Sequence, residues 1–289
     1  MINYFCDSDY QKNMKNKVVV ITGSTGVLCS IIAKSLANKG CKIALLAREK
    51  GKAESLRNEI IEAGGIAHIF EADVLKKEAL EKARLQITEK LGTCDILING
   101  AGGNHPLGTT SEPYLSQIDL DSNNPNFRTI FDLDPEGIKS VFDLNFLGTF
   151  LPTQVFAKDM VGKTGCSVLN ISSLSAVTPL TKIPAYSAAK AATSNLTQWL
   201  AVHFSKVGIR VNAIAPGFFL TNQNRSLLTS EDGSLTERGQ SIISHTPAGR
   251  FGNPEDLISS VMFLCDDRSS FVTGIVIPVD GGFSAFSGV

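Results

Sequence analysis

The sequence has no cysteines spaced for metal binding and only four histidines. Its six cysteines are scattered through the chain, none of them forms a C-x-x-C pair, and no histidine clusters with them. Structural zinc sites need such pairs or clusters, so we expect no metal site. Lys and Arg number 27 against 28 acidic residues, which leaves a net charge of −1 without any basic run. The charge distribution therefore gives no reason to expect a nucleic-acid partner.

Long hydrophobic runs are also absent. No stretch of 18 apolar residues is available to span a bilayer. The opening residues, MINYFCDSDYQKNMKNK, lack the apolar segment of a secretory signal. Apolar residues make up 43% of the chain, an ordinary share for a globular protein. We expect a cytoplasmic protein with a small-molecule partner and no membrane contact.

Short apolar segments alternate with helix-like segments along the chain. The expected strands cover 18–21, 42–46, 67–70, 96–98, 167–171, 210–214 and 275–278. The expected helices cover 31–38, 53–62, 77–90, 135–160, 185–204 and 254–265. Repeated strand–helix–strand units predict a parallel sheet with helices on both faces. We divide the chain into an N-terminal extension, 1–16, and one α/β domain, 17–289.

Two polar, turn-rich insertions follow strands of the predicted sheet, at 104–134 and 218–247. Loops of this length inside a domain are usually lids, binding loops or disordered segments. In an open α/β sheet, ligands bind beyond the carboxyl ends of the strands. Both insertions would therefore border the binding site.

The segment VVVITGSTGVLCS, from Val18 to Ser30, reads as a strand, a turn of small residues and the start of a helix. Glycines at such a turn let backbone N–H groups approach a pyrophosphate, and the helix N-terminus adds positive potential. Cys29 stands where a third small residue would pack the helix on the strand. We predict a dinucleotide-binding loop; an ordinary tight turn is the alternative. Its candidate contacts are Gly23, Ser24, Thr25, Gly26 and Leu28.

The ends of the next strands would meet the adenosine half of such a cofactor. The second strand ends in the neutral Ala47, followed by Arg48. A carboxylate at this point binds a ribose hydroxyl, whereas a cation suits a 2′-phosphate, so NADP(H) is favoured over NAD(H). Further candidate contacts after the third and fourth strands are Asp73, Val74, Asn99, Ala101 and Gly102.

The segment NISSLSAVTPLTKIPAYSAAKAATSN carries a candidate acid–base group. Tyr186 and Lys190 are four residues apart on a predicted helix, so their side chains share one face. A free tyrosine titrates near about pH 10, and an adjacent ammonium lowers that pKa. Ser173 ends the preceding strand at the same edge of the sheet, where its hydroxyl can hold a carbonyl oxygen.

Together with TGSTGVLC, NGAGG, DLNFLGTF and APGFFLT, these residues resemble the short-chain dehydrogenase/reductase family over most of the chain. The resemblance implies a Rossmann-like, doubly wound, seven-stranded parallel sheet in a single domain. It also implies an NAD(P)-dependent oxidoreductase that forms homotetramers or dimers. The family pattern makes Tyr186 the general acid–base, with Ser173 orienting the substrate oxygen. Lys190 would bind the nicotinamide ribose and lower the pKa of the tyrosine, and Asn145 would hold a water for proton relay. The implied contacts at the nicotinamide end are Pro216, Gly217, Phe219 and Thr221.

The sequence departs from the family pattern only at the cofactor site. Val27 and Cys29 stand at the usual second and third glycine places, and Gly26 comes one residue early. The usual NNAG reads NGAG.

The motifs GAGGN, FDLDPEG, LTKIPAYSAAKAA and VDGGFSAFSGV resemble more closely the branch that interconverts D-fructuronate and D-mannonate. A sugar acid needs a cation for its carboxylate and polar groups for its hydroxyls. The loops offer Asn104, His105, Asn224 and Arg225, of which Arg225 is the preferred carboxylate partner, and also Arg250. The alternatives are a reductase of another polyol or keto-sugar, such as a gluconate dehydrogenase, and a non-catalytic nucleotide-binding protein on the same fold.

Overall fold

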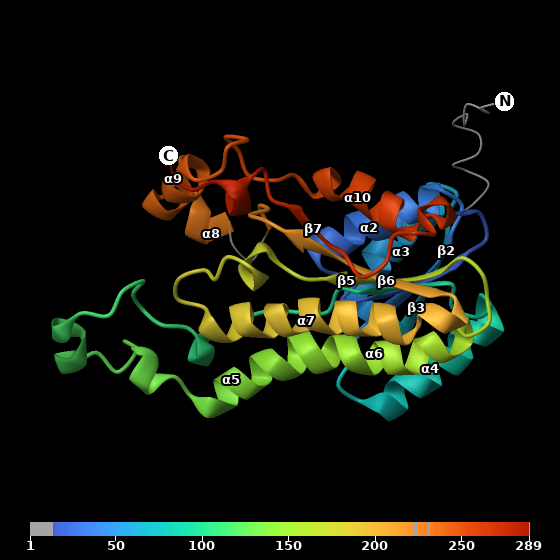
Figure 1. Cartoon of the computed structure of the whole chain (residues 1–289), viewed down its shortest axis with the longest axis horizontal. Coiled ribbons are helices and arrows are strands. Elements are labelled where there is room, and N and C mark those ends of the chain that lie inside the picture. Colours follow the sequence, from blue (N-terminus) through green and yellow to red (C-terminus); the bar gives the residue numbers. More distant parts are fainter. Residues whose placement is uncertain (1–13, 222–224, 231, 289) are drawn as a thin grey trace.

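Seven parallel strands form the centre of the protein (Figure 1). The computed structural model describes residues 14–221, 225–230 and 232–288. The strands are β1 (Val18–Thr22), β2 (Lys42–Ala47), β3 (Ile66–Glu71), β4 (Ile96–Asn99), β5 (Cys166–Ile171), β6 (Ile209–Pro216) and β7 (Val276–Val279). Their order across the sheet is β3-β2-β1-β4-β5-β6-β7, and every neighbouring pair is parallel. The predicted Rossmann-like, doubly wound sheet is confirmed.

Helices cover both faces of the sheet (Figure 1). One face packs against α2 (Val27–Asn38), α3 (Glu54–Glu62) and α10 (Ile258–Cys265). The other packs against α4 (Lys77–Lys90), α6 (Gly148–Phe156) and α7 (Pro184–His203). The remaining helices, which reach beyond one end of the sheet, are α5 (Pro135–Phe142), α8 (Arg225–Leu228) and α9 (Glu237–Ser244). Among the described residues, no helix combines the length and apolar character needed to cross a bilayer.

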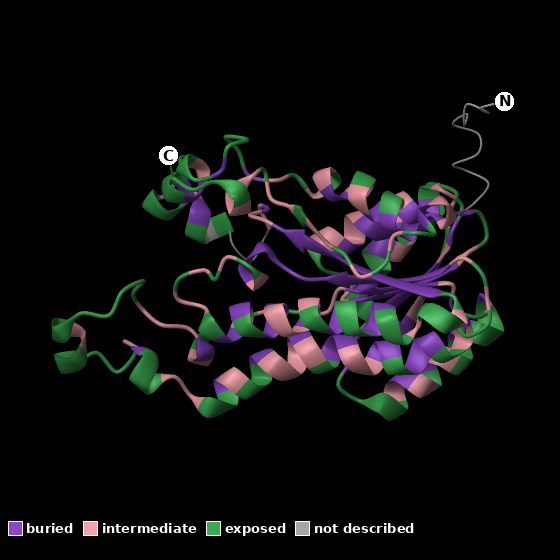
Figure 2. Cartoon of the chain, in the orientation of Figure 1, coloured by how far each residue is buried: buried purple, intermediate pink, exposed green. Residues whose placement is uncertain are grey.

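The first strand explains why the sheet segments read as uninterrupted apolar runs. Val19 and Ile21 belong to the core cluster under α2 and α10, whereas Val18 and Val20 belong to the cluster under α4 and α7. Successive side chains of a strand point to opposite faces, so a sheet covered on both sides needs apolar residues at every position. The inner strands β1, β2, β4, β5 and β6 are accordingly buried along nearly their whole length, whereas the edge strands β3 and β7 are partly exposed (Figure 2).

The structure interrupts the helix that the sequence predicts over 135–160. Helix α5 ends at Phe142, a π-helical turn covers Asp143–Leu147, and α6 begins at Gly148. The prediction of one continuous helix was therefore wrong at this turn. A π turn inserts an extra residue into the helical ladder and is often found at functional sites.

The insertion at 104–134 projects from the body of the protein at the end where α5 begins (Figure 1). It contains only short 3₁₀ turns, at Pro106–Gly108, Gln117–Asp121 and Ile130–Asp132. Most of it is exposed, as Figure 2 shows. Its first turn packs against the start of α5 and of α7, where a Cβ on Gly108 would lie 3.5 Å from the Gly137 carbonyl oxygen and 3.6 Å from the Cβ of Ala185.

Candidate active site

The turn between β1 and α2 has the geometry of a phosphate-binding loop. Gly23 adopts φ +61°, and a Cβ on it would lie 2.7 Å from the carbonyl oxygen of Gly100. Gly26 is the N-cap of α2 in extended conformation, and no side chain caps the helix. The first N–H groups of a helix have no partner within it, so this end suits an anion such as a pyrophosphate.

Three further predicted contacts lie on the same loop. Thr25 is exposed, and Leu28, at the start of the helix, is half-buried against the core cluster. Ser24 is fully buried and its hydroxyl donates to the carbonyl oxygen of Leu46, 3.0 Å away. The Ser24 side chain therefore ties the loop to β2.

Two of the departures from the family pattern, Cys29 and the glycine of NGAG, Gly100, are in direct contact with each other. A Cβ on Gly100 would collide with the sulfur of Cys29, so the thiol fills the space that the missing side chain leaves. Burial raises the pKa of the Cys29 thiol to about 12. Cys29 is therefore a packing residue between α2 and the end of β4, as the sequence predicts for this position.

The residues predicted for the adenosine half follow β2 and β3. Arg48 is exposed directly after β2, and Asp73 accepts a hydrogen bond from the N–H of Leu75, 3.0 Å away. Val74 is buried against α6 near Gly148.

Asn99 differs from the other candidates at this edge, because its side chain points into the core. Its amide nitrogen donates to Thr153 Oγ1 at 2.8 Å and to Asn170 Oδ1 at 2.9 Å. Only the backbone of Asn99 is left to meet a cofactor. Ala101 and Gly102, which follow it, leave the sheet between β1 and α7 and are not enclosed in the core.

The four predicted catalytic residues converge at the carboxyl edge of β4 and β5. Ser173 follows β5 and is the N-cap of a 3₁₀ turn. Tyr186 and Lys190 lie in the first two turns of α7, with the Lys190 nitrogen 5.7 Å from the centre of the tyrosine ring. Asn145 lies in the π turn and is completely buried.

The electrostatics of the acid–base pair are dominated by burial. Burial lowers the pKa of Lys190 to about 8, and its ammonium donates to the carbonyl oxygen of Ile171, 2.8 Å away. Burial also raises the pKa of Tyr186, against the opposing effect of a hydrogen bond with Ser173. The expectation that Lys190 lowers the pKa of Tyr186 is therefore not met in this geometry, because the ammonium is directed at Ile171 rather than at the phenol.

The Asn145 amide connects the π turn to the loop after β4. Its nitrogen donates to the carbonyl oxygens of Gly103, at 2.7 Å, and Val141, at 2.8 Å, and its oxygen accepts from the Gly103 N–H at 3.2 Å. A Cβ on Gly102 would lie 2.8 Å from Asn145 Oδ1 and 3.1 Å from Lys190 Nζ. Only glycine fits between these two side chains.

The predicted nicotinamide-end residues follow β6. Gly217 approaches β7 so closely that a Cβ would lie 2.6 Å from the Cα of Asp280. Phe219 is buried and pairs with Gly252 through an isolated bridge, while Pro216 ends the strand and Thr221 is half-buried.

The predicted substrate residues are less closely gathered. The Asn104 amide donates to Thr109 Oγ1 at 2.9 Å, and His105 Nδ1 accepts from the N–H of Leu107 at 3.2 Å, so both side chains stabilise their own loop. Arg225 is exposed at the start of α8. Asn224 lies outside the described residues.

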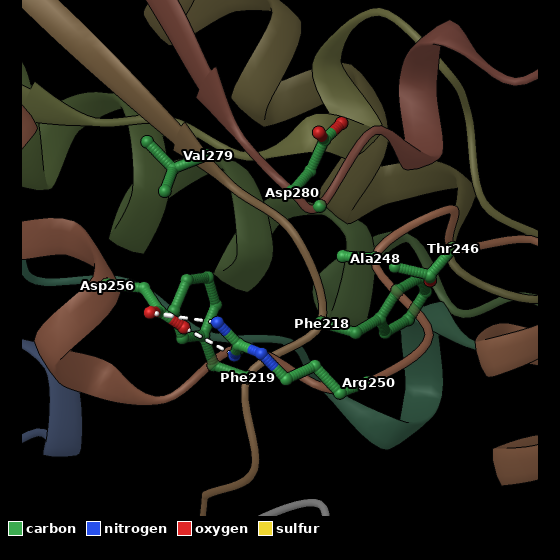
Figure 3. A pocket seen from close by; sticks show the side chains of 10 residues that line it. Phe218, Phe219, Thr246, Ala248, Arg250, Asp256, Val279 and Asp280 are labelled. Atoms are coloured by element: carbon green, nitrogen blue, oxygen red, sulfur yellow. Dashed lines mark hydrogen bonds and ion pairs between the residues drawn. The ribbon is translucent and has the colours of Figure 1, made fainter.

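A cavity of about 210 Å³ lies beside the ends of β6 and β7, and Ser173, Tyr186 and Lys190 do not line it. Arg250 binds Asp256 there with both guanidinium nitrogens, at 2.6 and 3.1 Å (Figure 3). A carboxylate already occupies this arginine, so Arg250 is not a free partner for a substrate carboxylate.

The family model described as enoyl-(acyl carrier protein) reductase matches residues 26–284. The chain belongs to the short-chain dehydrogenase/reductase family. It is therefore an oxidoreductase of the kind that acts on alcohol groups with a nucleotide cofactor.

Several relatives cover nearly the whole chain of this short-chain dehydrogenase/reductase. An uncharacterized oxidoreductase of Haemophilus influenzae is 56% identical over 278 residues, 96% of each chain. The uncharacterized oxidoreductase UxuB of Bacillus subtilis is 48% identical over 279 residues, 96% of this chain and 98% of its own. A crystal structure from Haemophilus influenzae, provisionally named a D-mannonate oxidoreductase and containing NAD, has a TM-score of 0.92 at 54% identity, covering 97% of this chain and 100% of that one.

The two glycines of the loop allow a matched test of its geometry. Gly23→Ala should lower the melting temperature of the protein by several degrees, because its Cβ meets backbone atoms under 3 Å away at a left-handed φ. Gly26→Ala places its Cβ 3.3 Å from one backbone oxygen at an ordinary φ, so it should melt as the wild type does. Differential scanning fluorimetry measures both. Equal melting temperatures for the two variants would contradict the loop geometry.

Proposed function

We propose that this short-chain dehydrogenase/reductase interconverts a keto-sugar acid and its hydroxy acid, D-fructuronate and D-mannonate, with NAD(P)(H). The observation that carries the reaction type is the convergence of Ser173, Tyr186, Lys190 and Asn145 beside the glycine loop. The provisional name of the 54% identical crystal structure supports the substrate. The polar character of the insertion after β6, with the segment TNQNRSLLTSEDGS, supports it further, since a steroid or acyl chain would need an apolar loop.

Each of the four side chains has a separate part in the proposed reaction. The nicotinamide, when bound, exchanges a hydride with the carbon that carries the substrate oxygen. Ser173 holds that oxygen, and Tyr186 Oη gives it a proton in the reductive direction. With a pKa of about 8, Lys190 is charged at neutral pH, and its ammonium, which donates to Ile171 here, would stabilise the phenolate that this proton transfer leaves once it turns toward Tyr186.

Asn145 has a positioning part in this proposal. Its amide fixes the Gly102–Gly103 backbone against Lys190, and its location in the π turn brings a main-chain segment next to the ammonium. We propose that a water held at Asn145 returns a proton to the lysine after each turnover.

We propose that both nicotinamide cofactors bind and that Arg48 favours NADP(H). The end of β2 carries no carboxylate: Ala47 is neutral, and the nearby Glu49 pairs with Lys52 at 2.8 Å. Exposed Arg48 is then free to meet a 2′-phosphate. The NAD in the related crystal structure supports binding of the second cofactor as well.

Initial rates with D-fructuronate, using NADPH and NADH in parallel, test the substrate. We expect rapid reduction of D-fructuronate and little of 5-ketogluconate, the control. Selective turnover of 5-ketogluconate would leave the family membership intact and replace the substrate.

The cofactor proposal predicts an asymmetric effect at one position. Arg48→Ala should raise the KM for NADPH by about tenfold, the effect of losing one charge-assisted contact, and change the KM for NADH by less than about threefold. Steady-state kinetics with each cofactor at saturating substrate measure both. Equal changes would show that Arg48 does not read the 2′-phosphate.

Tyr186→Phe should lower kcat by about 10²- to 10⁴-fold, because it removes the proposed proton donor. Cofactor binding, measured by fluorescence titration, should change little, since the ring remains. Tyr114→Phe, at an 84% exposed position in the insertion, is the matched control and should keep the wild-type rate. A rate near wild type in Tyr186→Phe would remove the acid–base assignment.

A further inference from the structure

Lys182 has a backbone conformation that its residue type disfavours. Among the described residues, only Asn16 and Lys182 adopt a positive φ without being glycine, and Lys182 has φ +71°. Asparagine tolerates this left-handed region, whereas a long side chain such as lysine rarely adopts it. The residue lies four positions before Tyr186, in the loop that joins Ser173 to α7. Backbone strain beside reacting groups is a reason to ask what the side chain does.

The strained residue is attached to the insertion. The Lys182 carbonyl oxygen accepts a hydrogen bond from the N–H of Thr110, 2.9 Å away. Two residues earlier, a Cβ on Gly108 would lie 3.6 Å from the Cβ of Ala185, the neighbour of Tyr186. The start of the insertion therefore packs along the first turn of α7, the helix that carries Tyr186, and its Thr110 is bonded to the Lys182 backbone.

The Lys182 ammonium has no close partner in the described part of the chain. Its side chain is only 28% exposed, and its one ion pair, with Glu112 of the insertion, measures 3.9 Å, too long for a hydrogen bond. The Lys182 nitrogen is not among the buried polar atoms that lack a partner in the described chain, so its three donors face solvent, where an anion can replace water. Unused donors on a cation indicate capacity for an anion.

Four other candidate cations are bonded within the protein or lie on another helix, and the half-buried Arg128 belongs to the insertion itself. Lys190 donates to Ile171, and Arg250 is bound by Asp256. The Nδ1 atom of His105 accepts a bond from its own loop. Arg225, the partner preferred from sequence, is exposed on α8. Lys182 is thus the half-buried cation nearest in sequence to Tyr186 whose hydrogen-bonding capacity is unspent.

We propose that Lys182 binds the carboxylate of the substrate, and that Glu112 is the internal carboxylate that the substrate replaces. This inference rests on the proposed sugar-acid function and names the group that selects an acid over a neutral ketose. The left-handed backbone is retained because it directs the side chain from a position fixed by Thr110. The insertion then acts in specificity, by supplying both the backbone anchor and the competing charge.

Lys182→Asn tests the charge without adding backbone strain, and Lys182→Arg retains the charge. D-fructuronate and D-fructose form a matched substrate pair, because they differ by a carboxylate in place of a hydroxymethyl group. Lys182→Asn should raise the KM for D-fructuronate by roughly 10- to 100-fold, as expected for a lost charge-assisted bond, and so reduce the preference for the acid. Lys182→Arg should restore most of that preference. Lys206→Asn, an exposed lysine beyond the other end of α7, should change neither KM.

Glu112→Gln provides the opposite change. Removing the competing carboxylate should lower the KM for D-fructuronate and tighten binding of D-mannonate, measured by calorimetry with the cofactor present. A wild-type KM for D-fructuronate in Lys182→Asn, with the reaction itself intact, would overturn the assignment of Lys182 alone. Absence of both D-fructuronate turnover and D-mannonate binding in the wild type would overturn the proposed function, and this inference with it.

Discussion

The hydrogen bonds between the Asn145 amide and the Gly103 backbone hold the candidate active site together. They join a helix that packs on one face of the sheet to the loop that leaves β4, and they place both beside Lys190. The π turn makes this possible, because an uninterrupted helix would rotate residue 145 relative to its neighbours. Gly102 is required for the same reason, since no side chain fits between Asn145 and the lysine. The orientation of the candidate catalytic groups thus depends on one buried amide.

A buried polar network beneath Asn145 makes its position unique. The hydroxyls of Thr149 in α6 and Thr193 in α7 donate to the backbone carbonyl oxygen of Asn145 at 2.9 and 3.3 Å. Deeper in the core, Asn170 accepts from Asn99 and donates to Thr197. Such groups are costly to bury unless they are hydrogen-bonded, so the two helices and the sheet fit well in only one register. These buried hydrogen bonds therefore fix the position of Asn145 beside the other candidate catalytic residues.

Local sequence patterns were sufficient to predict the parallel sheet and the edge of that sheet at which the candidate site lies. The run at 18–21 became β1 because a strand buried on both faces must be apolar throughout, and that requirement is written in consecutive residues. The placement of Ser173, Tyr186 and Lys190 at one edge followed from the topology of parallel strands.

The features that the sequence did not reveal depend on contacts between distant segments. No residue type marks the π turn, which is stabilised by Gly103, some 40 residues away. The collision between a Gly100 side chain and Cys29 becomes evident only when α2 and β4 are side by side. A left-handed backbone is intrinsically unfavourable for a lysine, and at Lys182 the hydrogen bond from the Thr110 N–H to the carbonyl oxygen stabilises it. The direction of the pKa of Tyr186 was misjudged because burial raises it and the Lys190 ammonium donates to Ile171 instead of to the phenol.

Lys190 shows how the chemistry opposes the stability of the fold. Its pKa is about 8 in the folded protein against 10.5 for an ordinary lysine, so the protonated form disfavours folding. At neutral pH both the folded and unfolded states carry the proton, and the full cost, about 3 kcal/mol, is present. The cost shrinks as the pH rises from about 8 to about 10.5, where the folded state has lost its proton and the unfolded state has not, and it vanishes above that range. The two hydrophobic clusters offset this cost, and the proposed proton transfer requires a charged group that can turn toward the phenolate of Tyr186. Lys190 is therefore unfavourable for the stability of the folded protein and required for the proposed proton transfer.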